Sequence, residues 1–370
     1  MKKFFSIVIA LAVILTCATS SATEKLIEAS GSYVMDSRLD ETPASATARA
    51  REEAKRAAVE KAGVYLQAYS KTINLEFDTD EVRTVAARLL KIQDESSNVE
   101  VVENNLLKFT VTIKALIEDN QDEVLKTMMQ DRQSLEEMTR KYNELQESYD
   151  ALNRDMEKYK RDFNTANDTQ RDEIKKEVAR NTEKFSAVDE LARGNELAFS
   201  KKFTQALEAY DAAIKLNPQL AEAYNNRGIV RYDMGEFSAA IDDYTTAINL
   251  KPNYAEALNN RGNAYAALER FAEAERDLTA AVKLKDNSAV IHNNLGSVHL
   301  SQGKFDAAIS EYERAIQLSP RYAEAYYNRA IANYGKKNFL QALSDAMQAM
   351  TLNPNDSAAR TLYEKIGRSQ

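Results

Sequence analysis

Four ten-residue stretches of this sequence resemble one another at a spacing of 34 residues. They read AEAYNNRGIV at 221–230, AEALNNRGNA at 255–264, AVIHNNLGSV at 289–298 and AEAYYNRAIA at 323–332. Whole columns of residues repeat with the same period. Phenylalanine recurs at Phe203, Phe237, Phe271, Phe305 and Phe339, and a small residue recurs at Gly194, Gly228, Gly262, Gly296 and Ala330. A constant period of this length predicts an array of similar structural units.

Each column has a structural reason that indicates a pair of antiparallel helices. The small residue allows two helices to approach closely, and the phenylalanine follows a short turn, where a second helix would begin. Proline cannot continue a helix, and it closes four of the units, at Pro218, Pro252, Pro320 and Pro354. A helix–turn–helix unit cannot bury its apolar face alone, so we expect the units to stack into a solenoid.

These columns resemble the tetratricopeptide repeat, which implies a right-handed superhelix of helix pairs. Five repeats would cover 187–220, 221–254, 255–288, 289–322 and 323–356, and a solvating cap helix would follow at 357–370. Large apolar residues, usual in this family, are replaced at Glu190, His292 and Ala346. We expect looser packing at these three sites.

The resemblance also implies a concave groove lined by the first helix of each repeat. Asparagines share groove positions, with Asn226, Asn260, Asn294 and Asn328 in one column and Asn225, Asn259 and Asn293 beside them. An amide offers two donors and an acceptor without charge, so this column would hold the backbone of an extended peptide. The alternative is that these amides only bond neighbouring helices or water. Further groove residues would be Tyr232, Tyr327, Tyr334, Glu222 and Glu256.

Some tetratricopeptide repeats bind a partner's C-terminal carboxylate through lysine and arginine on successive first helices. The corresponding places here hold Leu191, Asn195 and Glu256, without those cations. We therefore expect the ligand to be a neutral or mildly basic extended protein segment.

The segment 121–166 predicts a coiled coil. One seven-residue column comprises Met128, Leu135, Tyr142, Tyr149, Met156 and Phe163, and a second comprises Val124, Met138, Leu145, Leu152, Tyr159 and Ala166, interrupted at Asp131. Alternating steps of three and four are typical of such seams, so we expect a homo-oligomer through 124–166. The alternative is one helix that folds back on its own domain. The polar stretch 164–172 predicts a hinge, and 167–186 a linker helix.

Residues 23–120 predict a small α+β domain. Strands are expected at SGSYVMDS (30–37), TINLEF (72–77), NVEVVEN (98–104) and LKFTVTIKALI (107–117), with helices over 44–70 and 81–90. This pattern resembles a small domain of bacterial outer-membrane lipoproteins and of a flagellar ring-assembly protein. The resemblance implies a location in the cell envelope and contacts with proteins.

The N-terminus has the pattern of a secretory signal peptide over 1–22. Lys2 and Lys3 precede an apolar core that is shorter than a membrane-spanning helix, and Ala22 suits a cleavage site. The alternatives are a lipoprotein modified at Cys17, the only cysteine, and an uncleaved anchor. We expect export to the periplasm or cell envelope, with no membrane-embedded segment in the mature chain.

The sequence contains no motif of a catalytic, cofactor-binding or metal site. His292 and His299 share a helix face, but no cysteine or carboxylate close in sequence completes a metal site, so both are interpreted as packing residues. The formal net charge of −8 and the lack of a basic stripe argue against nucleic acid as a partner.

The expected fold class is mainly α, with a C-terminal tetratricopeptide-repeat solenoid, a central coiled-coil helix and a small N-terminal α+β domain. The predicted function is that of an exported bacterial scaffold or adaptor, not an enzyme, which captures an extended protein segment. The alternative is a structural spacer or assembly chaperone of the envelope, whose repeats contact a folded partner or one another.

Overall fold

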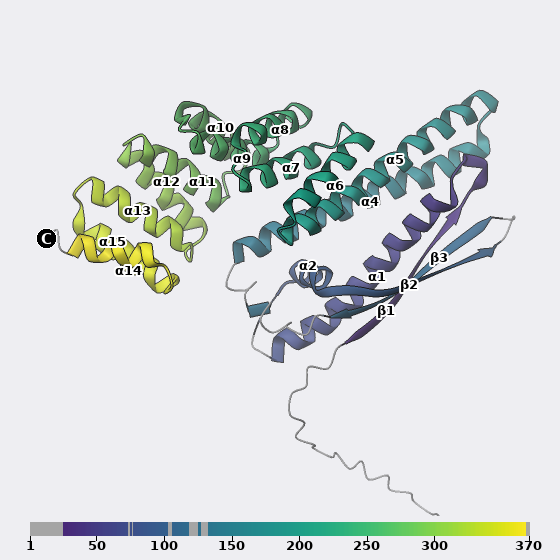
Figure 1. Cartoon of the computed structure of the whole chain (residues 1–370), viewed down its shortest axis with the longest axis horizontal. Coiled ribbons are helices and arrows are strands. Elements are labelled where there is room, and N and C mark those ends of the chain that lie inside the picture. The colour runs from purple at the N-terminus through teal and green to yellow at the C-terminus, as the bar shows by residue number, and fades with distance from the viewer. Residues whose placement is uncertain are drawn as a thin grey trace, which may run out of the picture. The chain divides into compact units, whose positions relative to one another are not determined.

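Strands and long helices make up the N-terminal part of the structure, and stacked helix pairs make up the rest (Figure 1). The structure, a computed structural model, describes residues 25–72, 75, 77–102, 106–117, 125–126 and 132–367. The chain divides into two compact units between Ala179 and Arg180. The predicted signal peptide at 1–22 lies outside the described residues.

Unit 1 contains the small α+β domain that the sequence predicts. Its elements are β1 (Leu26–Met35), the 3-10 helix η1 (Ser37–Leu39), α1 (Pro43–Thr72), α2 (Thr79–Leu89), β2 (Leu90–Val101) and β3 (Leu107–Ile117). The strands form one antiparallel sheet in the order β1–β3–β2. Of the strand predicted at 72–77, Thr72 ends α1, the described Leu75 and Phe77 lie in no strand, and the other positions are outside the described residues.

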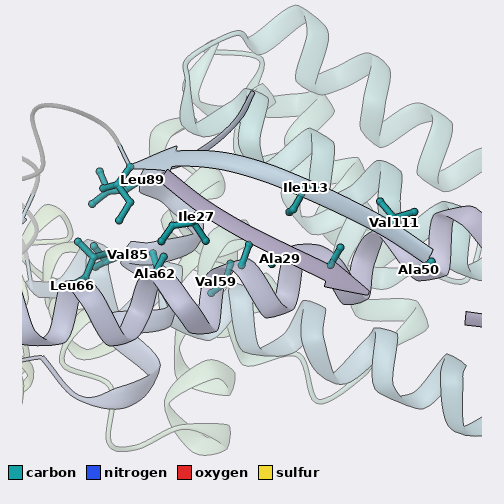
Figure 2. Close-up of a cluster of buried hydrophobic side chains, with 14 of the residues drawn as sticks. Ile27, Ala29, Ala50, Val59, Ala62, Leu66, Val85, Leu89, Val111 and Ile113 are labelled. Carbon is teal, nitrogen blue, oxygen red and sulfur yellow. The ribbon is translucent and has the colours of Figure 1, made fainter. Parts of the chain in front are cut away.

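Helix α1 packs directly on β1 because both elements are small at the contact. Buried alanines recur every four residues along the helix, at Ala46, Ala50, Ala54, Ala58 and Ala62. On the strand side, a Cβ added to Gly31 would lie 2.2 Å from the Ala54 backbone nitrogen. Figure 2 shows the resulting core between α1, α2 and the sheet, with labelled side chains from β1 (Ile27, Ala29), β3 (Val111, Ile113) and α2 (Val85, Leu89).

Helix α4 (Arg132–Thr165) carries most of the seven-residue columns that predicted a coiled coil between chains. Of these apolar residues, those described in α4 are buried or half-buried against the same chain. Leu135 joins the core formed by α1, α2 and the sheet. Further along, Met156 and Phe163 pack with Leu39 of η1 and Val178 of α5. Val124, Met128 and Asp131 of the predicted columns lie outside the described residues.

Polar contacts also fix α4 to α1 of its own unit. Arg49 donates to Asn153 at 2.6 Å, and Arg56 pairs with Asp150 at 2.8 Å. The described part of the predicted seam, residues 132–165, therefore follows the alternative that the sequence left open, a helix that folds back on its own domain, because α1 and the sheet need a second apolar cover. An oligomer through 124–166 is not shown.

The segment predicted as a hinge contains a tight turn between α4 and α5 (Asp168–Phe199), which lie antiparallel (Figure 1). Asn167 and Gln170 cap the second helix, since each accepts the other's backbone N–H at 2.9 and 3.0 Å. Helix α5 continues past 187 without a break. The predicted linker helix 167–186 and the first helix of repeat one are thus a single helix, and the two units meet within it.

Unit 2 is the predicted solenoid of helix pairs. The first helices of repeats two to five are α7 (Ala221–Asp233), α9 (Ala255–Ala267), α11 (Ala289–Ser301) and α13 (Ala323–Gly335). The second helices of all five repeats are α6 (Phe203–Leu216), α8 (Phe237–Leu250), α10 (Phe271–Leu284), α12 (Phe305–Leu318) and α14 (Phe339–Leu352). Every second helix begins at a residue of the phenylalanine column, so the predicted phase of the repeat is confirmed.

The glycine column makes each pair of helices fit together. A Cβ on Gly228 or Gly296 would lie 2.7 Å from the ring of Tyr244 or Tyr312 on the facing second helix. The fifth repeat has Ala330 at the glycine position and Ala346 opposite it, so two small residues replace a glycine and a tyrosine. Both alanines are fully buried.

The cap helix α15 (Ser357–Gly367) fills the space that Ala346 leaves. Ile366 is fully buried in one cluster with Ala330, Ala342 and Ala346, and Leu362 and Tyr363 pack against it. The expectation of loose packing at Ala346 is therefore wrong, because the cap supplies the missing volume.

Candidate peptide-binding groove

The first helices of successive repeats are joined by hydrogen bonds between asparagine side chains. Asn260 Nδ2 donates to Asn225 Oδ1 of the preceding repeat at 3.1 Å, and Asn294 repeats this bond to Asn259 at 2.9 Å. Asn328 repeats it again to Asn293 at 3.0 Å. Because neighbouring first helices lie close enough for these bonds, their shared side is the inner face of the solenoid.

The same chain of bonds begins at repeat one with a different partner. Asn226 Nδ2 donates to Asn195 Oδ1 at 2.9 Å, and Asn195 also accepts from Tyr210 at 3.0 Å. Within the repeats, Asn225 donates to Asn226 at 3.1 Å and Asn259 to Asn260 at 3.3 Å. The predicted asparagines thus form a ladder, which we call the amide ladder (Asn195, Asn225, Asn226, Asn259, Asn260, Asn293, Asn294 and Asn328). Its bonds run from Asn195 to Asn294, and Asn293 and Asn328 form a separate pair, because Asn293 donates to Glu324.

The two asparagine columns have different environments. Asn225, Asn259 and Asn293 are buried, so they mainly join the repeats. Of the second column, Asn226 is buried, whereas Asn260, Asn294 and Asn328 are half-exposed. An amide nitrogen carries two N–H donors, and each of these three residues uses one of them within the ladder. The second donor of each makes no bond to another of the described residues.

The predicted groove glutamates form ion pairs with lysines of the same chain. Glu222 binds Lys251 at 3.1 Å and Glu256 binds Lys285 at 3.0 Å, each within its own repeat. Glu324 accepts a hydrogen bond from Asn293 at 3.1 Å. The charges of Glu222 and Glu256 are therefore offset by lysine.

The predicted tyrosines lie in two different environments. Tyr232 packs edge-on against Phe237 with ring centroids 5.2 Å apart, and Tyr334 packs against Phe339 at 5.7 Å. Both rings thus support the turn between the helices of a repeat. Tyr327 stands in the column of Asn225, Asn259 and Asn293 and is half-exposed, so it ends the amide ladder at repeat five.

In repeats two and three, the arginine that follows the asparagines fixes the first helix between two second helices. Arg227 pairs with Asp243 of its own repeat and with Asp211 of the preceding one, both at 2.5 Å. These carboxylates hold the pKa of Arg227 above its usual range even though burial alone would lower it. Arg261 similarly bridges Asp277 at 2.6 Å and Thr245 at 3.1 Å.

The fourth repeat replaces this ion pair with a histidine pair. Leu295 stands at the arginine position, and Glu311, at the aspartate position, binds Nδ1 of His292 at 2.6 Å. Nε2 of His292 lies 3.1 Å from the Asp286 carbonyl oxygen. His292 is buried, so the loose packing expected there is not found. The hydrogen bond to Glu311 raises the pKa of His292 above 6.5, and it outweighs the opposite effect of burial.

These inter-helix pairs were not predicted from the sequence, although a pattern in the sequence indicates them. Aspartate or glutamate follows the arginine column by 16 residues, at Asp243, Asp277, Glu311 and Asp345. Only the helix-pair geometry shows that this spacing brings two side chains into contact. Across the described residues, no cluster of histidine, cysteine and carboxylate groups is arranged to hold a metal ion. No helix in the described part of the chain is long and apolar enough to cross a membrane.

Comparison with known families identifies the repeats. Residues 194–235, 230–269 and 296–337 match the family described as TPR repeat, and residues 255–288 match the family described as Tetratricopeptide repeat. No relative is found among curated proteins.

Solved structures with a similar fold include the following three proteins. YrrB, described as a TPR protein with an unusual peptide-binding site, is 24% identical, with a TM-score of 0.42 over 51% of this chain and 96% of its own. A thermophilic TPR protein of Thermus thermophilus is 22% identical, with a TM-score of 0.43 over 49% and 99%. PilF of Pseudomonas aeruginosa is 19% identical, with a TM-score of 0.47 over 50% and 85%.

Proposed function

Because this chain is a tetratricopeptide-repeat protein, we propose that it is a non-enzymatic adaptor that binds an extended segment of another protein along its inner face. The observation that carries this proposal is the amide ladder. It places half-exposed amides at equivalent positions in three successive repeats, at Asn260, Asn294 and Asn328.

The chemistry of the inner face favours a peptide backbone as the ligand. Each exposed amide of the ladder keeps a donor that can reach a peptide carbonyl group. Glu222 and Glu256 are neutralised by Lys251 and Lys285, so a strongly charged ligand gains little there. A neutral or mildly basic segment in extended conformation fits these donors best.

The proposal is tested by peptide selection followed by affinity measurement. Peptides of 12 residues are selected from a random library on the full chain, and the dissociation constant of one is measured by fluorescence anisotropy. The double variant Asn260→Ala/Asn294→Ala should weaken binding about tenfold, because two peptide-facing donors are lost.

A matched variant separates binding from folding. Asp242→Ala/Arg276→Ala changes two exposed residues of the second helices α8 and α10 and should leave the affinity unchanged. Thermal melting of both variants shows whether the array stays folded. Equal binding by the folded asparagine variant would refute the groove and favour a spacer or chaperone whose repeats contact a folded partner.

We also propose that the protein acts outside the cytoplasm, in the periplasm or cell envelope. The signal-peptide pattern of residues 1–22 supports this location, with cleavage after Ala22. Fractionation of a bacterium that expresses the full chain should place it with envelope proteins. N-terminal sequencing should then begin at Thr23, and an intact N-terminus in the cytoplasm would refute export.

A further inference from the structure

Strand β2 lies at an edge of the sheet, since the strand order is β1–β3–β2. All of its side chains from Lys91 to Val101 are exposed. Three of them are large and apolar, and 45% of Ile92, 49% of Val99 and 68% of Val101 remains exposed. A long edge strand with apolar side chains is a template for pairing with another strand.

The opposite edge strand, β1, is protected from such pairing. Lys61 Nζ donates to the Glu28 carbonyl oxygen at 2.7 Å, and Lys160 Nζ donates to that of Val34 at 2.9 Å. Lysine side chains at an edge disfavour the addition of a further strand. The sheet is therefore more open to extension at β2 than at β1.

We propose that β2 pairs in antiparallel fashion with β2 of a second copy of this chain, with a twofold axis at Ser96. The strand sequence LKIQDESSNVEV is self-complementary in this register. Ile92 would face Val99 of the second copy, and Leu90 would face Val101. Lys91 would face Glu100, so opposite charges meet in the same register. The dimer interface thus lies on the sheet of unit 1 and does not involve α4.

The two kinds of pair fall on opposite faces of the sheet. Ile92 and Val99 lie opposite Ala115 and Phe109 of β3, which are buried under α1, so the apolar pairs extend that core. Glu100 lies on the other face, where it binds Lys108 of β3 at 3.1 Å. Lys91 of the second copy would lie on the other side of Glu100, so that the Glu100 carboxylate lies between the ammonium groups of Lys108 and of this Lys91.

The irregularity of β2 is compatible with this register. The pairing of β2 with β3 shifts between Ile92 and Asp94, so Gln93 forms a bulge. In the dimer Asp94 faces Asn98 of the second copy and, after the bulge, Ile92 faces Val99. The twofold axis repeats the bulge symmetrically, and each apolar pair therefore occurs twice in the interface.

A disulfide test locates the axis. In the full chain carrying Cys17→Ser, which removes the only native cysteine, Ser96→Cys places two thiols directly opposite each other. Mild oxidation should convert most of this variant into a covalent dimer on a non-reducing gel. Asn98→Cys is the control on the same face of the strand. Its two thiols would lie about 13 Å apart, too far for a disulfide. A monomer in both variants, or equal cross-linking of both, would overturn the proposal.

A charge exchange tests the register without oxidation. Lys91→Glu and Glu100→Lys should each weaken the dimer about tenfold in sedimentation equilibrium, because each places like charges opposite one another at two symmetric sites. The double variant Lys91→Glu/Glu100→Lys should restore the dissociation constant to within about threefold of the native value. Single variants that dimerise as well as the native chain, or a double variant no better than they are, would contradict this register.

Discussion

At the scale of residues, the arginine and asparagine columns hold the repeats together by different means. The arginines join three helices through carboxylates, as Arg227 does with Asp211 and Asp243. The asparagines mainly join first helices to one another, through uncharged amides. The columns themselves were visible in the sequence, and they predicted the array and its phase. The partners of these residues were not visible in the sequence, because contacts at spacings of 16 and 35 residues depend on how the helices pack.

Breaking one buried ion pair should destabilise the array measurably. Asp277→Ala leaves the guanidinium of Arg261 half-buried without its carboxylate, at a cost of about 1–3 kcal/mol in the free energy of unfolding. The control Glu190→Ala removes a more exposed partner, that of Arg193, and should cost less than about 1 kcal/mol. Urea denaturation measures the free energy of unfolding of both variants. Equal losses of stability would show that burial does not strengthen the ion pairs of the arginine column.

The histidine pair of repeat four should make stability depend on pH. The pKa of His292 is raised in the folded chain, so the protonated imidazole stabilises the fold. This contribution to the free energy of unfolding is complete below about pH 6.5, the pKa in the unfolded chain, and is lost as the pH rises through the pKa in the folded chain. Glu311 and Asp286 face the imidazole, and Asp286 also binds Arg314.

The variant His292→Gln keeps a polar side chain but does not titrate in this range. Urea denaturation at pH 6, 7 and 8 should show the native chain losing stability relative to this variant as the pH rises. A constant difference between the two proteins would mean that the pKa of the imidazole is the same in the folded and unfolded states.

At the scale of elements, amphipathic columns predicted which residues are buried but not which surface covers them. The seam of α4 has coiled-coil spacing, yet Leu135 and Met156 are covered by the same chain. A seven-residue pattern specifies an apolar stripe, and any apolar surface of the right shape can cover it. The α+β domain was predicted from alternation, and β3 confirms it. Strand β2 begins earlier than its sequence suggested, because residues 91–97 are exposed and, apart from Ile92, polar.

The cap helix should be as important for stability as a core helix. Ile366→Ala removes a fully buried side chain that fills the space beside Ala346, and should cost about 2–4 kcal/mol. Leu340→Ala is the matched control on α14, where 78% of the leucine is exposed, and should change stability by less than about 0.5 kcal/mol. Thermal and urea melts distinguish them, and a neutral Ile366 variant would show that α15 does not close the array.

At the scale of the whole molecule, the two units carry separate interaction surfaces. Unit 2 presents the amide ladder, and unit 1 presents the edge strand β2. If both proposals hold, a dimer displays two arrays, and a partner with two extended segments would bind more tightly than a partner with one. In both proposals, the bound segment or strand is held through backbone hydrogen bonds.

The most direct test of the central claim changes the backbone of the ligand. A peptide selected on the full chain is compared with an analogue of the same side chains whose amide nitrogens are methylated at alternate residues. Methylation removes backbone donors and obstructs approach to the neighbouring carbonyl groups. If the amide ladder holds the ligand by its backbone, fluorescence anisotropy should show the analogue binding at least about tenfold more weakly. Equal affinity of the two peptides would contradict backbone recognition by the inner face.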